Sequence, residues 1–123
     1  MISYILFALA AICNAVMDTL VHHYNKSIFT KLNAWFWDAT ISWTNKYIDH
    51  LPTKGLRMLI WKIPMLPAFT DAWHLFKSIM IVLLVLGAVL YEPLLGIGWD
   101  FLTIGIIWNL TFNLFYNKIL RKK

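Results

Sequence analysis

Residues 1–22 of the chain contain neither proline nor glycine, and most of them are apolar. A helix rises about 1.5 Å per residue, so about 20 residues cross the roughly 30 Å hydrocarbon core of a bilayer. Two later stretches are similarly long and apolar, and hydrophobic residues make up 60% of the chain, above the usual share in a soluble domain. The sequence therefore predicts an all-α integral membrane protein, a bundle of three transmembrane helices in one domain over residues 1–123, with spans at about 2–23, 71–91 and 99–120.

Aromatic side chains dominate residues 28–48, where they recur at helical spacing between polar residues. An apolar face rich in Trp and Phe beside a polar face is typical of a helix that lies in the headgroup layer. We therefore predict an amphipathic, Trp-rich interfacial helix over about residues 28–48, with Ser27 as its N-cap. The alternative is that this segment is a fourth transmembrane helix. Prolines and a glycine break residues 49–67, which predicts a basic loop with a short helix over 56–63.

Basic residues are unevenly distributed along the chain. Six Lys or Arg lie between residues 26 and 62 and four follow from Lys118, whereas the N-terminus and residues 92–100 have none. Because Lys and Arg accumulate in cytoplasmic loops, we expect the N-terminus outside and the C-terminus in the cytoplasm, which three spans satisfy and four do not. The net charge of +5 also predicts contact with the lipid bilayer's anionic headgroups, and the scattered cations argue against a nucleic-acid partner.

Several common catalytic signatures are missing from the sequence. The single cysteine, Cys13, excludes a disulfide within the chain and a cysteine-rich zinc site, and its apolar surroundings disfavour a reactive thiolate. There is no Gly-x-Ser-x-Gly nucleophile motif and no glycine-rich phosphate loop. The first apolar run lacks a basic start, so we expect it to be retained as a helix and not cleaved as a signal peptide.

Carboxylates and imidazoles cluster where two predicted spans meet the cytoplasmic face. Asp18 and His22 are four residues apart and Asp71 and His74 are three apart, so each pair shares one helix face. The three-span topology brings both pairs to the same side of the membrane, and we expect all four residues to lie close together. Ionisable groups at this depth mark functional sites by default. The set offers four ligands to a divalent metal (Zn, Mn or Fe), or an acid–base set for catalysis.

Four further side chains support this candidate site: Asn14, His23, Asn109 and Asn113. Purely structural roles explain the same pattern equally well. Asp71 would then cap its helix, Asp18 would hydrogen-bond His74 or Lys77, and the asparagines would link helices through their amides. An ion or proton path is a third interpretation.

A site of this kind would open at headgroup depth, so an enzyme built on it should act on a lipid or a lipid-linked substrate. A metal-bound water would be the nucleophile, and an Asp or His would be the base. The leading hypothesis is a small multi-pass membrane protein with a polar, metal-binding Asp/His site at the cytoplasmic interface. The alternative is a non-enzymatic oligomeric subunit with a structural or pore-forming role. A bundle this small buries little surface alone, so we expect a homo-oligomer in both cases.

Two segments carry a resemblance to a known group of proteins: Ser42-Trp43-Thr44-Asn45-Lys46-Tyr47 and Thr70-Asp71-Ala72-Trp73-His74. They look like small uncharacterised bacterial membrane proteins with an S-W-x-N-K-Y segment before a T-D-x-W-H segment. The resemblance covers the middle part of the chain and implies no activity. It implies that the two segments belong to one unit, and we expect a location in the bacterial inner membrane.

Overall fold

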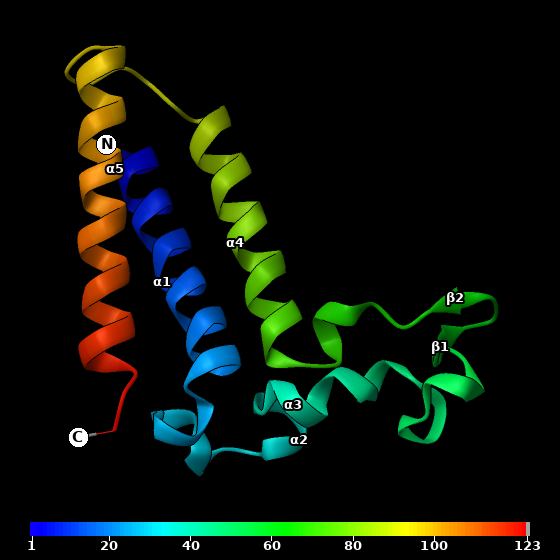
Figure 1. The fold of residues 1–123 in the computed structure, drawn as a ribbon. Helices are drawn as coiled ribbons and strands as arrows, with labels where there is room; N and C mark the ends of the chain where they lie inside the picture. The colour runs from blue at the N-terminus through cyan, green and yellow to red at the C-terminus, as the bar shows by residue number, and fades with distance from the viewer. Residues whose placement is uncertain (123) are drawn as a thin grey trace.

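The computed structural model describes residues 1–122, so Lys123, one of the four C-terminal cations, lies outside the described residues. Within them, three long helices run in alternating directions: α1 (Ile2–His22), α4 (Ala72–Val89) and α5 (Ile97–Leu114) (Figure 1). α5 continues into a π-helical turn, Phe115–Ile119. The three predicted apolar stretches are therefore helices. By length and composition, α1 and α4 are long and apolar enough to cross a membrane.

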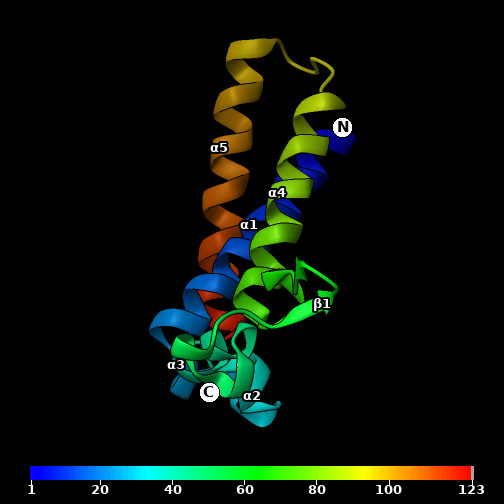
Figure 2. The same cartoon turned by 90° about the vertical axis from the view of Figure 1, so that its right-hand side faces the viewer.

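α1 is the central helix, because α4 packs along one side of it and α5 along another (Figures 1 and 2). Its Ala10, Ala11 and Ala15 are fully buried, and such small side chains let neighbouring helices approach closely. Gly87 of α4 acts in the same way, since a Cβ at this position would lie 3.2 Å from the ring of Phe7. Small residues on facing sides therefore set the packing of α1 against α4.

Large apolar side chains cover much of the outer surface of the bundle. On α4, Val82 and Val89 are exposed, and on α5, Phe101, Ile106 and Leu110 are exposed. Continuous apolar surface is unusual on a soluble monomer and is typical of helices that face lipid. The buried core is correspondingly small and gathers at one end of the bundle, around the last turns of α1.

The predicted continuous helix over residues 28–48 is wrong. The chain instead forms four short pieces across the end of the bundle: a 3-10 turn (Ile28–Lys31), α2 (Ala34–Trp37), α3 (Ala39–Ser42) and a second 3-10 turn (Trp43–Lys46) (Figure 1). Capping side chains explain the breaks. Asn33 accepts a hydrogen bond from Trp35 N and Asp38 accepts one from Thr40 N, so each ends one piece and starts the next. Ser27 caps the first piece, as predicted.

The short helix predicted over residues 56–63 is also wrong. This segment forms an antiparallel hairpin of β1 (Met58–Ile60) and β2 (Ile63–Pro64), whose turn holds Lys62 at a φ of 64°. Pro64 cannot donate a helical hydrogen bond, and isoleucines favour extended backbone. Four further 3-10 turns lie between α1 and α4: Tyr24–Lys26, Ile48–His50, Pro52–Lys54 and Pro67–Phe69.

The two ends of the bundle differ in charge. The N-terminus and the connection between α4 and α5 lie at one end, with Glu92 and Asp100, whereas residues 23–71 and the segment after α5 lie at the other (Figures 1 and 2). Every Lys and Arg among residues 1–122 belongs to the second end, including Lys77 in the second turn of α4. We call these ends the acidic end and the basic end.

Candidate functional site

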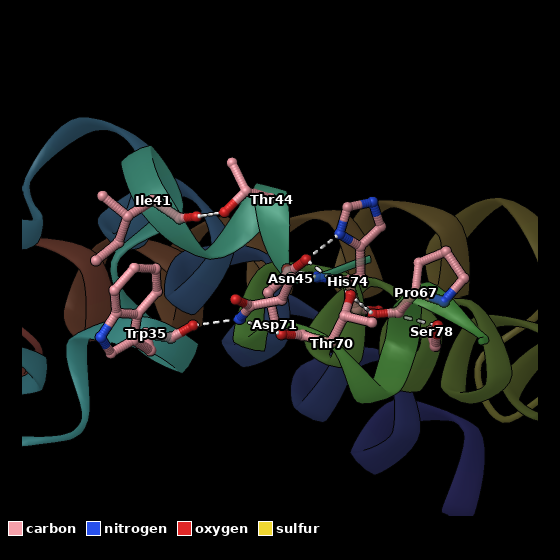
Figure 3. Close-up of polar contacts among 9 residues, drawn as sticks. All are labelled: Trp35, Ile41, Thr44, Asn45, Pro67, Thr70, Asp71, His74 and Ser78. Carbon is pink, nitrogen blue, oxygen red and sulfur yellow. Dashed lines mark hydrogen bonds and ion pairs between the residues drawn. The ribbon is translucent and has the colours of Figure 1, made fainter. Parts of the chain in front are cut away.

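Asp71 and His74 form a close pair at the start of α4, at the basic end (Figure 3). One carboxylate oxygen of Asp71 accepts the backbone N–H of His74 at 2.8 Å, which caps the helix. The other oxygen lies 2.7 Å from Nδ1 of the same histidine. Asp71 is only 1% exposed, while the side chain of His74 is 29% exposed. The buried carboxylate therefore holds the proton on Nδ1 and leaves Nε2 as the free ring nitrogen.

Neighbouring polar groups hold this pair in place. Thr70 Oγ1 donates to Pro67 O at 2.8 Å and lies 3.4 Å from Asp71 Oδ2. Asn45 Nδ2 donates to the carbonyl oxygens of Trp35 and Thr70, the latter at 2.8 Å (Figure 3). One amide thus joins the α2–α3 segment to the start of α4. The two segments that carry the family resemblance, 42–47 and 70–74, are in direct contact through it.

No hydrogen bond joins the second predicted pair, Asp18 and His22, to the first among residues 1–122. Asp18 is half-buried in α1, and His22 is exposed at the last residue of that helix. His22 lines a separate cavity of about 290 Å³ together with His23, Lys26, Asp38 and Thr40. In the described part of the chain, no three His, Cys, Asp or Glu side chains are grouped so that they could hold a metal ion. Of the four predicted site residues, only Asp71 and His74 are joined by a hydrogen bond among residues 1–122.

None of the four supporting residues forms a hydrogen bond with Asp71 or His74 among residues 1–122. Asn14 is half-buried in α1, and His23 packs against the ring of Tyr116 with centroids 5.4 Å apart. Desolvation lowers the pKa of His23, and the positive charge of Arg121 lowers it further. The asparagines of α5 are exposed and form a ladder in which each amide hydrogen-bonds one turn back, through Asn109, Asn113 and Asn117.

The sequence analysis missed a buried carboxylate at the acidic end, Asp100, which it placed only within the last predicted span. Asp100 is 1% exposed and accepts four hydrogen bonds. The donors are the hydroxyls of Tyr4 and Tyr91, the latter at 2.7 Å, and the backbone N–H groups of Leu94 and Leu95. The sequence offered one signal for this cluster: a single aspartate between apolar runs, with a tyrosine near the acidic end of each of the two other long helices. Asp100 thus links all three long helices at the acidic end.

No protein-family model, curated protein or solved structure matches the chain. The chemistry of the site therefore follows from its own geometry. A carboxylate that fixes the Nδ1–H tautomer leaves Nε2 able to accept a proton and return it, and it stabilises the imidazolium that forms meanwhile. The Asp71–His74 pair can thus perform general acid–base chemistry on a group that reaches Nε2.

Proposed function

We propose that the protein is an integral membrane protein of three spans, with its acidic end outside and its basic end in the cytoplasm. The apolar lengths of α1 and α4 and the exposed apolar surface of α5 support this arrangement. The confinement of Lys and Arg to one end supports the orientation, because basic residues accumulate on the cytoplasmic side. The location that we propose is the bacterial inner membrane.

At the basic end, we propose that Asp71 and His74 act as an acid–base pair on a lipid or lipid-linked substrate. The observation that carries this proposal is the 2.7 Å contact of the buried Asp71 carboxylate with His74 Nδ1. The pair lies in the first turn of α4, where the apolar helix begins, and Lys77 Nζ lies 4.9 Å from the centroid of the Trp73 ring in the same region. Trp and Lys side chains of this kind favour the headgroup layer, so headgroups are the substrates within reach.

Metal binding by Asp71 and His74 is a different role from acid–base catalysis. Asp71 is buried, and both of its carboxylate oxygens and Nδ1 of His74 already form hydrogen bonds, so Nε2 is the one ring or carboxylate atom of the pair without a hydrogen-bond partner among residues 1–122. The divalent metal predicted from the sequence would need further ligands. The proposal therefore assigns proton transfer, and not metal binding, to these two residues.

Replacing His74 with glutamine should slow the consumption of the lipid substrate about 100-fold or more. The glutamine keeps a polar side chain but cannot accept the proton. The test uses the purified chain in vesicles of phosphatidylethanolamine and phosphatidylglycerol that also contain a polyprenyl diphosphate. Mass spectrometry of the extracted lipids measures how fast each lipid is consumed. His22→Gln is the matched control, because His22 is exposed at the same end but forms no hydrogen bond with Asp71 or His74 among residues 1–122. Equal rates for the His74→Gln and wild-type proteins, or no lipid consumed by either, would contradict the proposal.

The alternative function, a non-enzymatic oligomeric subunit, is favoured by the asparagine ladder of α5. Exposed amides recur every four residues on one face of α5, at Asn109, Asn113 and Asn117. Gly105 lies one turn before Asn109 on the same face. Amides that would face lipid tend to hydrogen-bond a neighbouring helix, and an amide carries both a donor and an acceptor for an identical partner. A homo-oligomer through α5 is therefore the assembly that we propose with this alternative. An unchanged lipid pool in the vesicle assay would favour it.

A further inference from the structure

The basic end carries a groove without a single acidic residue. It has a volume of about 800 Å³ and is lined by Ile28, Lys31, Lys118, Ile119, Arg121 and Lys122. We call it the basic groove. Its residues come from the 3-10 turn Ile28–Lys31, from the π-helical turn Phe115–Ile119 and from the segment beyond that π-helical turn.

Backbone hydrogen bonds hold the walls of the basic groove together. Ile28 N donates to Leu120 O at 3.0 Å, and Lys122 N donates to Lys26 O at 2.8 Å. The π-helical turn Phe115–Ile119 places Lys118 and Ile119 on the groove, and π-helical turns occur frequently at functional sites. The backbone therefore joins the two sides of the groove directly.

The cations of the basic groove have no counter-ions among residues 1–122, where the ion pair formed by a Lys or Arg is Lys54–Asp49. Arg121 adds a more specific signal. Its Nε is buried and has no acceptor within the described residues, while its guanidinium carbon lies 5.2 Å from the centroid of the Tyr116 ring. The terminal guanidinium nitrogens donate no hydrogen bond among residues 1–122 and are not buried, so they are the donors that an acceptor from outside the chain can reach. The lowered pKa of His23, partly due to Arg121, agrees with a positive potential here.

We propose that the basic groove binds the phosphate group of an anionic phospholipid. Arg121 and Lys118 would contact the phosphate, because guanidinium and ammonium groups match its charge and hydrogen-bonding geometry. Ile28 and Ile119 provide apolar contacts that a soluble phosphate would not use, which is why we assign a lipid. Basic pockets at the cytoplasmic ends of spanning helices bind such headgroups. This inference rests on the proposed membrane location but not on the acid–base role of His74.

The test measures lipid binding to the full chain in a neutral detergent by isothermal titration calorimetry. Dihexanoylphosphatidylglycerol is the probe, and dihexanoylphosphatidylcholine and inorganic phosphate are the comparisons. We expect the phosphatidylglycerol to bind at least tenfold more tightly than either comparison. Equal affinity for the phosphatidylcholine would overturn the proposal, and equal affinity for inorganic phosphate would overturn the assignment of a lipid.

Variants locate the binding. Lys118→Gln and Arg121→Gln should each weaken phosphatidylglycerol binding about fivefold, and together about 25-fold. Lys62→Gln removes the same charge from the hairpin turn, outside the groove, and should change the affinity less than twofold. Lys118 is exposed, so its variant keeps the proposal falsifiable even if Arg121→Gln fails to fold. An equal loss in Lys62→Gln would show diffuse attraction and overturn the site. His74→Gln should bind like wild type, which separates this test from that of the proposed function.

Discussion

Replacing Asp100 with alanine should lower the free energy of unfolding by about 3 kcal/mol, since hydrogen bonds to a charged group are worth roughly 1.5–3 kcal/mol. Four donors lose their acceptor at once, and they come from α1, from the end of α4 and from the connection to α5. The phenols of Tyr4 and Tyr91 would then lie unpaired where water has limited access. The loss should begin locally, with faster hydrogen exchange over residues 90–97.

Reversible unfolding in detergent micelles, followed by circular dichroism, measures this change. Glu92→Ala is the matched control, because Glu92 is an exposed carboxylate in the same connection and forms no hydrogen bond through its side chain among residues 1–122. Surface changes of that kind usually stay within about 0.5 kcal/mol. A loss in Asp100→Ala no larger than in Glu92→Ala would show that the buried carboxylate does not hold the acidic end together.

Replacing Asp71 with alanine should cost about 2 kcal/mol, because it removes a helix cap and the contact with His74. Asp71→Asn should cost less, since the amide oxygen still accepts the backbone N–H of His74. Its amide nitrogen, however, would donate to His74 Nδ1 and move the ring proton to Nε2. Asn at this position therefore preserves the cap while it removes the free base, which separates stability from chemistry.

Nitrogen-15 NMR of labelled histidine reports the tautomer directly, and chemical unfolding reports the stability. Asp38→Ala is the control for the cap alone, since Asp38 accepts Thr40 N in the same way but is partly exposed and starts a helix of only four residues. We expect wild-type His74 to carry its proton on Nδ1 and the Asp71→Asn variant to carry it on Nε2. The same tautomer in both proteins would contradict the orienting role of Asp71.

The long helices followed from the sequence, because apolar length and helical periodicity are local properties that tertiary packing does not reverse here. The error over residues 28–48 came from the same reliance on periodicity. Aromatic spacing fitted a helix, but the side chains of Asn33 and Asp38 compete for backbone N–H groups and restart the chain twice. Capping residues inside an amphipathic pattern therefore deserve more weight than the pattern itself.

The sequence predicted only the part of the candidate site whose residues are neighbours in the sequence. Asp71 and His74 are three residues apart on one helix, and their contact follows from that spacing. No hydrogen bond joins Asp18 to this pair among residues 1–122. A contact of that kind between helices depends on the rotation of α1 about its axis, which the sequence pattern does not define. The Asp100 cluster depended on Tyr4, 96 residues away, so no local pattern could reveal it.

Cysteine labelling from each side of sealed vesicles tests the three-span arrangement most directly. In a Cys13→Ala background, single cysteines replace Glu92 at the acidic end and Lys54 and Lys118 at the basic end, and a membrane-impermeant maleimide reports which side each one faces. We predict that the cysteine at 92 reacts only from outside, and that those at 54 and 118 react only from the cytoplasmic side. Reaction of the cysteine at 54 or at 118 from the same side as the one at 92 would contradict three spans.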